Sequence, residues 1–425
     1  MTKLATMRPP ENEVPLFPIP EPDLTPEEAI DRARAMLPQL LERQAETEAL
    51  TYYPEATHQE FLKNGLYRVM QPRRYGGYEF DPATFFKIVI ELARGCTSSA
   101  WCYCLCSAHV LQMTGLFDDP ALTEIIGPDG EFRAACFGFH TGTIRKVEGG
   151  YRVTGVWPYA SGSPYSTHYI GHTYLPPEKE GDARGPEVTF VIPRSEWELC
   201  NDWGDVLGLK GSGSHSVRIE DGFVPESHVT RGNLMMGRAQ GPMRVNPNPM
   251  YVGRQGGITS GELSALATGA AWGALDEYGK IISTRKAVLQ PNSLRVDLPD
   301  YQRYYGRATA LIGSAEAIII RMAEEYMEIA QRSARDGVDF PRQDDMRLAL
   351  IAKEAGRLAW TAMQEFIFRT GGSQAAKDGQ RLQRYFRDMA TFWSHTAPSS
   401  DDFFAQQYTR AVFGLELADS PTVPR

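Results

Sequence analysis

The chain has 425 residues and a formal charge of −9, with 42% hydrophobic and 23% charged residues. This length exceeds the size at which one hydrophobic core stops growing, so it predicts two or three packed subdomains. The 44 Lys and Arg residues are dispersed and are outnumbered by 53 Asp and Glu residues, which argues against a nucleic-acid or anionic-membrane surface. The N-terminus lacks an apolar signal region, and no window of about 18 residues is free of charged and polar groups. We therefore expect a cytoplasmic protein that acts on small molecules.

Helices are expected over the first third of the chain, after an extended arm. Residues 1–25 are rich in Pro and Glu, with few side chains able to pack. At Thr25 a helix is predicted to begin, because Thr is a favoured N-cap and Pro26 follows at the first helical position. The helical period continues, so we expect a helical domain over 26–131. Four cysteines between 96 and 106 lie in an apolar run without glycine, which favours a buried helix over a zinc site.

The pattern changes to strands at 132–235. Residues 132–162 alternate β-branched and aromatic residues with polar ones, and Glu148-Gly149-Gly150 supplies a hairpin turn. More β runs are predicted at 166–175, 186–193, 197–200 and 215–225. About 100 residues of this kind suit a small barrel or sandwich. His168 and His172 share a face of one predicted strand, but no third ligand is apparent, so no metal site is expected.

Long helices are predicted for the rest of the chain, 236–425. After a Pro-, Asn- and Gly-rich stretch the helical period returns, and helices are expected at about 258–288, 299–335, 343–369 and 376–394, with a shorter one near 401–417. Their apolar faces are wide. We therefore expect a four-helix bundle that packs on itself and against a second subunit.

Several common catalytic motifs are missing. The sequence contains no GxxxxGK[ST] loop, GxSxG elbow, HExxH pair or strand-associated GxGxxG. This argues against P-loop nucleotide hydrolysis, α/β-hydrolase chemistry, zinc-dependent proteolysis and a Rossmann nicotinamide site.

Five segments, in order, carry a family resemblance. They are 65–80 (GLYRVMQPRRYGGYEF), 93–109 (ARGCTSSAWCYCLCSAH), 150–162 (GYRVTGVWPYASG), 207–226 (LGLKGSGSHSVRIEDGFVPE) and 382–398 (LQRYFRDMATFWSHTAP). Together they resemble the acyl-CoA dehydrogenase superfamily, and especially its flavin-dependent monooxygenase branch, such as the oxygenase components of hydroxyphenylacetate hydroxylase and dibenzothiophene monooxygenase. The resemblance implies a mainly α fold with a central β domain: an N-terminal helical domain, a β-barrel or sandwich and a C-terminal four-helix bundle. It also implies a homotetramer whose flavin lies between β domain and bundle and is completed by a neighbouring subunit.

The resemblance also assigns roles to individual residues. Flavin contacts are implied for the strand end and turn at Trp157, Ala160, Ser161 and Gly162, for Arg285 at the cofactor phosphates, and for the glycine turn Thr370, Gly371, Gly372 and Ser373. Ser161 would hydrogen-bond near flavin N5. His395 matches the catalytic histidine of the oxygenase branch, and His109 matches a pocket histidine. The plainer readings are a Ser-Gly turn, a solvated Arg, a helix C-cap and core histidines with satisfied hydrogen bonds.

The implied reaction is the hydroxylation of an aromatic or polycyclic small molecule. A separate flavin reductase would supply reduced FMN or FAD, O2 would form a C4a-hydroperoxyflavin, and His395 would act as the base. One alternative is an acyl-CoA dehydrogenase with tightly bound FAD, for which Glu262 or Asp378 could be the base. A second alternative is a catalytically silent helical scaffold.

Overall fold

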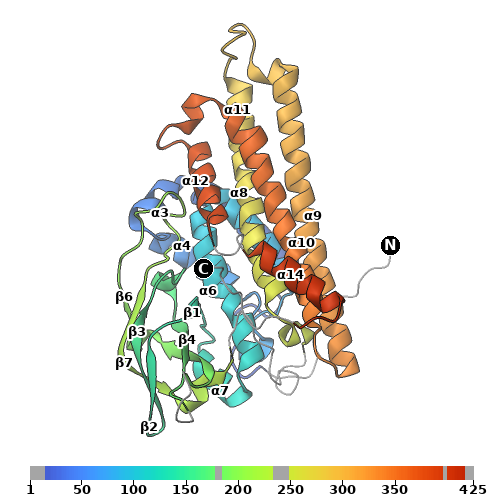
Figure 1. Ribbon diagram of the computed structural model, residues 1–425. Helices are drawn as coiled ribbons and strands as arrows, with labels where there is room; N and C mark the ends of the chain where they lie inside the picture. The colour runs from blue at the N-terminus through green and yellow to red at the C-terminus, as the bar shows by residue number, and fades with distance from the viewer. Residues whose placement is uncertain (1–14, 178–183, 233–247, 396–399, 417–425) are drawn as a thin grey trace.

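The computed structural model describes residues 15–177, 184–232, 248–395 and 400–416. Helices come first, two β-sheets follow, and long helices complete the chain. Figure 1 shows the sheets at one side of the molecule and the long C-terminal helices running side by side at the other. The expected order of helical, β and helical regions is confirmed.

The N-terminal region consists of short helices that precede two longer ones. These are α1 (Pro26–Ala35), α2 (Leu37–Glu42), α3 (Gln44–Leu50), α4 (Glu55–Lys63), α5 (Pro82–Gly95), α6 (Thr97–Leu116) and α7 (Asp119–Ile126). Thr25 caps α1 as expected, in a reciprocal pair with Glu28. The single helix predicted to follow is wrong, because the structure divides it into α1, α2 and α3. Pro38 has no amide hydrogen to continue the α1 ladder, and the amide of Met36 instead bonds Ala33 three residues back.

The cysteine-rich helix α6 lies in the middle of the molecule. It packs against α5, α8 and α12 and against strand β1. Almost all of its side chains are buried, and the four cysteines between 96 and 106 are free thiols inside the helical core. The buried-helix interpretation is therefore confirmed.

The β region contains two four-stranded sheets. Their strands are β1 (Ala134–His140), β2 (Thr143–Val147), β3 (Gly150–Trp157), β4 (His168–Tyr174), β5 (Glu187–Pro193), β6 (Glu198–Leu199), β7 (Val217–Pro225) and β8 (Val229–Arg231). The sheet orders are β1-β4-β5-β8 and β2-β3-β7-β6. One apolar cluster draws side chains from both sheets, so they pack face to face as a sandwich. Gly149, with φ +75°, makes the predicted hairpin turn, whereas β8 was not predicted.

The C-terminal helices are close to their expected positions. They are α8 (Gly256–Thr284), α9 (Pro299–Asp336), α10 (Arg342–Thr361), a π-helical turn (Ala362–Phe368) that leads into α11 (Arg369–Gly371), α12 (Arg381–Trp393) and α14 (Asp401–Val412). The start of α12 was predicted five residues too early, because Ser373–Ala376 forms a separate 3-10 turn. Within the described ranges, no helix is long and apolar enough to cross a membrane.

Candidate active site

His395 lies two residues beyond the end of α12, against an indole. Its ring centroid is 5.6 Å from that of Trp101 on α6, with the planes at 73°, and Phe392 contacts the same indole at 6.0 Å. His395 is exposed in the single chain, and the indole of Trp101 contacts its ring. The loss of surrounding water lowers the pKa of His395 to about 4, and the charge of Lys353 contributes further. The imidazole is therefore neutral at pH 7 and can accept a proton.

Ser161 contacts the same indole through its hydroxyl. The Trp101 Nε1–H donates to Ser161 Oγ at 3.0 Å. Ser161 Oγ lies 2.7 Å from Ser214 Oγ, which lies 2.7 Å from Ser212 Oγ, so three hydroxyls form a chain. The structure thus brings His395 and Ser161 to one side chain, Trp101. Trp101 was not among the predicted site residues. The sequence feature that could have indicated it is a tryptophan among the mostly small residues of 97–104.

The turn that carries Ser161 fits tightly against α6. Gly162 has φ +78°, and a Cβ there would lie 2.7 Å from the carbonyl oxygen of Cys102. Only glycine permits this approach without strain. Ala160 is fully buried, and its amide donates to the carbonyl of His215. The turn is therefore held between α6 and the loop that precedes β7, residues 207–216, here called the serine-rich loop.

Trp157 occupies a different environment from the rest of this turn. Its side chain is completely buried between the two sheets, 5.7 Å from Phe190 and 5.8 Å from Tyr169 between ring centroids. The Trp157 indole thus packs within the sandwich, and the flavin contact expected at this strand end stays a prediction. Side chains along β3 alternate between the two faces of its sheet, and that of Trp157 falls on the face inside the sandwich. The turn at residues 160–162 comes only after the strand has ended.

A buried carboxyl ties α12 to the serine-rich loop. Asp388 Oδ1 accepts a hydrogen bond from the amide of Leu209 at 2.6 Å. Arg387 donates to the carbonyl of Leu207 and pairs with Glu48 of α3 at 2.8 Å. Burial raises the pKa of Asp388 to about 7. These contacts fix α12, the helix that leads to His395, relative to the hydroxyls of Ser161, Ser212 and Ser214.

His109 lies further along α6, beside β1. Its Nδ1 is 2.7 Å from the carbonyl oxygen of Ala134, and since a carbonyl only accepts, Nδ1 carries the proton. Burial lowers the pKa of His109, although the bond to Ala134 opposes this. Eight residues separate it from Trp101, or about 12 Å along the helix. His109 is thus well separated along α6 from Trp101, the residue that His395 contacts.

Arg285 lines a cavity at the far end of the bundle. This cavity of about 160 Å³ is lined by Glu277, Lys280, Ile281, Thr284, Arg285, Ala375, Gln380, Arg381 and Leu382. Its walls carry three cationic side chains and one carboxylate. Arg285 Nη1 is buried and has no hydrogen-bond partner among the described residues. A buried guanidinium nitrogen without a partner favours an anion at this place.

The glycine turn adjoins this cavity through Ala375. Gly372 has φ +84°, and a Cβ there would lie 3.0 Å from Arg295 Nη2. Arg295 also donates to the carbonyl of Gly371 at 2.8 Å, while the hydroxyl of Thr370 donates to Tyr278 at 2.7 Å. Ser373 begins the 3-10 turn that leads to Ala375. Arg295, which sequence reasoning missed, is the cation that directly contacts the turn.

The predicted flavin residues therefore form two groups. The Ser161 group, residues 160–162, lies near the C-terminal end of α12, whereas the Arg285 group, Arg285 and 370–373, lies near its N-terminal end at Arg381. Helix α12 has 13 residues, which span about 20 Å. In Figure 1, α11 marks the upper end of the bundle, where the Arg285 group lies, and α6 lies below it. The structure does not bring the two groups into contact.

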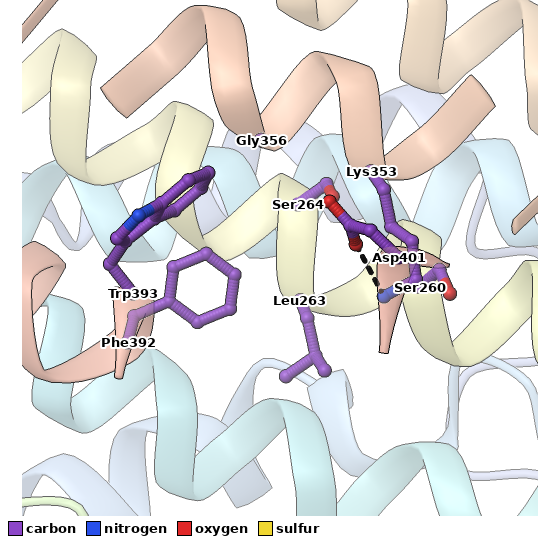
Figure 2. A pocket seen from close by; sticks show the side chains of 8 residues that line it. All are labelled: Ser260, Leu263, Ser264, Lys353, Gly356, Phe392, Trp393 and Asp401. Carbon is purple, nitrogen blue, oxygen red and sulfur yellow. Dashed lines mark ion pairs between the residues drawn. The ribbon is translucent and has the colours of Figure 1, made fainter. Parts of the chain in front are cut away.

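A smaller cavity lies beside the residues that precede His395. Figure 2 shows its lining of Ser260, Leu263, Ser264, Lys353, Gly356, Phe392, Trp393 and Asp401. Its volume of about 20 Å³ suits a water molecule rather than a flavin. Lys353 and Asp401 form an ion pair on its wall, with Nζ and Oδ1 3.0 Å apart.

The two carboxyls considered for a dehydrogenase lie elsewhere. Glu262 of α8 is buried near Cys104 of α6, and burial raises its pKa to about 8, so it is protonated at pH 7 and unsuited to act as a base. Asp378 is exposed and accepts a hydrogen bond from Gln383. Among the described residues, no group of three or more His, Cys, Asp or Glu side chains is placed to hold a metal ion.

Comparisons with known proteins agree with this architecture. Two family models match the chain, the N-terminal domain of acyl-CoA dehydrogenase over 26–116 and its C-terminal domain over 262–400. The flavin-dependent monooxygenase oxygenase subunit HsaA of Rhodococcus jostii (strain RHA1) is 28% identical over 92% of this chain and 100% of that protein. The oxygenase component of p-hydroxyphenylacetate 3-hydroxylase from Acinetobacter baumannii is 24% identical over 93% of this chain and 91% of that protein. The solved structure of XiaF from Streptomyces sp., in complex with FADH2 and glycerol, has a TM-score of 0.82 at 25% identity and covers 94% of this chain and 97% of that one. The chain belongs to the acyl-CoA dehydrogenase family, in its branch of flavin-dependent monooxygenase oxygenase components.

Proposed function

We propose that this chain hydroxylates an aromatic small molecule with reduced flavin and O2, and that His395 acts as the base. The observation that carries the proposal is the arrangement around Trp101. Its ring contacts the neutral imidazole of His395, and its Nε1–H holds the hydroxyl of Ser161. A proton acceptor and a hydroxyl group are thereby both placed against one indole.

The residues present suit a flavin. An isoalloxazine is flat and largely apolar with a polar rim, and its phosphate needs cationic or N–H donors. The apolar rings of Trp101 and Phe392 with the hydroxyl of Ser161 fit the ring system. Arg285 Nη1, which has no partner within the described part of the chain, fits a phosphate. When bound, reduced flavin activates O2, so that one oxygen atom enters the substrate and the other leaves as water.

His395 and Ser161 have distinct duties in this scheme. The neutral His395 accepts the phenolic proton of the substrate, which makes the ring carbon more nucleophilic. Ser161 Oγ already accepts from Trp101 Nε1, because an indole N–H only donates. The hydroxyl hydrogen of Ser161 is thus directed to Ser214 or to a ligand atom. The rings of Trp101 and Phe392 keep water away from the reacting atoms.

The cofactor proposed for this site is FAD, bound between two subunits of a homotetramer. Two observations support this: the Arg285 group lies about 20 Å from the Ser161 group along α12, and its cavity is cationic. The Arg285 group of one subunit would then receive the phosphates of a flavin whose ring lies against Ser161 of its neighbour. FAD carries a second phosphate and an adenosine, which would use such a remote anion site.

A separate flavin reductase is proposed as the partner. The relatives HsaA and p-hydroxyphenylacetate 3-hydroxylase are named as oxygenase subunits or components, which implies that another protein supplies their electrons. The same names support an aromatic substrate, and His395 favours a phenol.

The test begins with anaerobic titration of the purified protein with reduced FAD and with reduced FMN. The loaded protein is then mixed with ¹⁸O₂ and a panel of phenols and heteroaromatics. We expect tight binding of reduced flavin and one labelled oxygen atom in the product. Absence of flavin binding would favour the scaffold alternative. A yellow protein that oxidises acyl-CoA substrates without incorporating oxygen would favour the dehydrogenase.

A further inference from the structure

The outward side of α9 carries no charge over its central turns. This helix of 38 residues packs against α8 and α10 with one side, which in these turns buries Ala308, Ile312, Ala315 and Ile319. The opposite side, here called the α9 face, is exposed or half-buried and consists of Gly306, Ala310, Gly313, Ser314 and Ala317. Figure 1 shows α9 at the side of the bundle that is turned away from the sheets. A helix side that meets only water normally carries charged residues, so this face is poorly suited to water.

Two residues of the α9 face are glycines that the packing of this chain does not require. A Cβ placed on Gly306 or Gly313 would meet no described atom within 4 Å. In the buried helix α8, by contrast, a Cβ on Gly261 would lie 2.6 Å from Met322 Cε. Glycine inside a helix lowers the stability of that helix, because it has more freedom in the unfolded chain. The glycines of the α9 face thus leave the backbone open to close approach from outside.

Charges of opposite sign flank the α9 face at equal distances. Arg303 lies ten residues before Gly313, and Glu324 lies ten residues after Ser314. Both fall on the same side of the helix as the α9 face, because the α-helix turns by 100° per residue. Within the described chain their ion pairs are with exposed neighbours three residues away, at 2.9 and 3.4 Å. Such exposed pairs contribute little, so both charges remain available to a partner.

We propose that the α9 faces of two copies of this chain pack against each other, antiparallel, around a two-fold axis that passes between Gly313 and Ser314. A two-fold interface uses the same surface on both copies, so that surface must be complementary to itself. The small residues at the centre allow the two helix axes to approach to the short end of the usual range of about 8 to 10 Å.

The charges fit the same axis. Ala310 lies opposite Ala317 of the partner subunit, and Arg303 lies opposite Glu324 of the partner subunit, with both contacts repeated by the symmetry. A closed tetramer with two-fold axes needs two different interfaces of this kind. The proposed flavin site between subunits is one, and the α9 face supplies the other. This inference concerns assembly and does not depend on the proposed reaction.

The first test is the size of the flavin-free protein, measured by light scattering and sedimentation over a range of concentrations. Ala310→Glu places a long charged side chain at the centre of the interface. We expect the tetramer to fall to dimers, with a dissociation constant raised by about thirtyfold or more, as for a central interface residue. The variant should fold, because Ala310 is exposed in the single chain and Glu is a good helix former. Ala45→Glu, the same change at an exposed alanine of α3, is the matched control and should leave the size unchanged.

The second test exchanges the two charges. Arg303→Glu and Glu324→Arg each place like charges opposite one another, so each should weaken the assembly by about tenfold or more, since the symmetry repeats the mismatch. The double variant Arg303→Glu/Glu324→Arg should recover the original size. On one helix the two positions are 21 residues apart, about 30 Å, so recovery requires contact between chains.

Three results would overturn the interface: a monomeric unmodified protein, an unchanged size in Ala310→Glu, or a double variant no better assembled than the single ones. Flavin binding and hydroxylation are measured separately, so failure of this interface leaves the proposed reaction standing.

Discussion

Trp101 sets the relative positions of two side chains that come from distant parts of the chain. Its Nε1 is bonded to Ser161, 60 residues away, and its ring contacts His395. The indole is itself 3% exposed and belongs to the helical core. Because core side chains occupy fixed rotamers, the Trp101 indole gives both the proposed base and the proposed flavin contact a fixed surface to contact.

His395→Ala tests the base directly. We expect hydroxylation to fall by about 10²- to 10⁴-fold, because a positioned general base contributes that much, and H2O2 to be released instead. Binding of reduced flavin should be retained, since the proposed flavin contacts lie on Ser161 and Arg285. Product and peroxide are measured in the same reaction. Ser394→Ala, in the neighbouring exposed residue, is the control, and normal coupling in His395→Ala would exclude His395 as the base.

The buried carboxyl of Glu262 should make the stability of the folded protein depend on pH. Its folded-state pKa is raised by burial from 4.5 to about 8, so the native state holds a proton that the unfolded state releases between these values. The stability from this group is complete below pH 4.5 and is lost as the pH rises to about 8, a loss of a few kcal/mol at about 1.4 kcal/mol per pKa unit. Glu262→Gln should therefore unfold at higher urea than the unmodified sequence at pH 8.5, with the advantage much reduced at pH 5. The exposed Glu365→Gln should show no such trend, and a difference independent of pH would contradict the prediction.

At the scale of elements, α8 depends on a cap supplied by another helix. The carboxylate of Asp345 on α10 accepts from the amides of Gly257 at 2.8 Å and Gly256 at 3.3 Å, the first residues of α8. These amides have no partner within their own helix. The cap thus joins α8 and α10 at the end opposite to Arg285.

Asp345→Ala should lower the free energy of unfolding by about 1 to 2 kcal/mol, as loss of an N-cap does. Urea unfolding followed by circular dichroism measures the change. Asp344→Ala, which removes a partly exposed partner of Arg347, should cost less than half as much. Equal losses in the two variants would mean that the cap contributes nothing specific.

The spacing of apolar residues was enough to predict most helices and strands, because it shows which face of each element is buried. The α6 cysteines and the long C-terminal helices are of this kind. The break at Met36 and the 3-10 turn at Ser373–Ala376 depend on single residues and were missed. The contacts of Trp101 and Arg295 were missed for another reason: their partners lie 60 and 76 residues away, a pairing that no local pattern encodes. The burial of the Trp157 indole within the sandwich was also not predicted, because the position of a residue in a motif does not tell which face of a strand is covered.

At the scale of the whole molecule, the position of the Arg285 group fits the proposed assembly of several subunits. A cationic cavity lies about 20 Å along α12 from His395, and it holds a buried Arg285 nitrogen to which no described residue is hydrogen-bonded. In the proposed homotetramer it would serve the neighbouring subunit. Light scattering should then give about four times the chain mass of 47.4 kDa.

Arg285→Ala should weaken binding of reduced FAD by about tenfold or more, because a charge-assisted hydrogen bond to phosphate is lost. Binding of reduced FMN should change little if the Arg285 group receives the adenosine end of FAD. Anaerobic calorimetry with both flavins measures the two affinities. The exposed Arg369→Ala is the control, and equal weakening of FMN and FAD binding would contradict the assignment.

The buried cysteines of α6 bear on how such an enzyme survives its own chemistry. Oxygenases that misfire release peroxide, and peroxide attacks the thiolate form of cysteine. Burial raises the pKa of Cys96, Cys102, Cys104 and Cys106, so all four remain as thiols within the helical core. The helix that carries Trp101 is therefore rich in cysteine, but these cysteines stay protonated. An oxidant formed beside it meets carbon and protonated sulfur rather than a reactive thiolate.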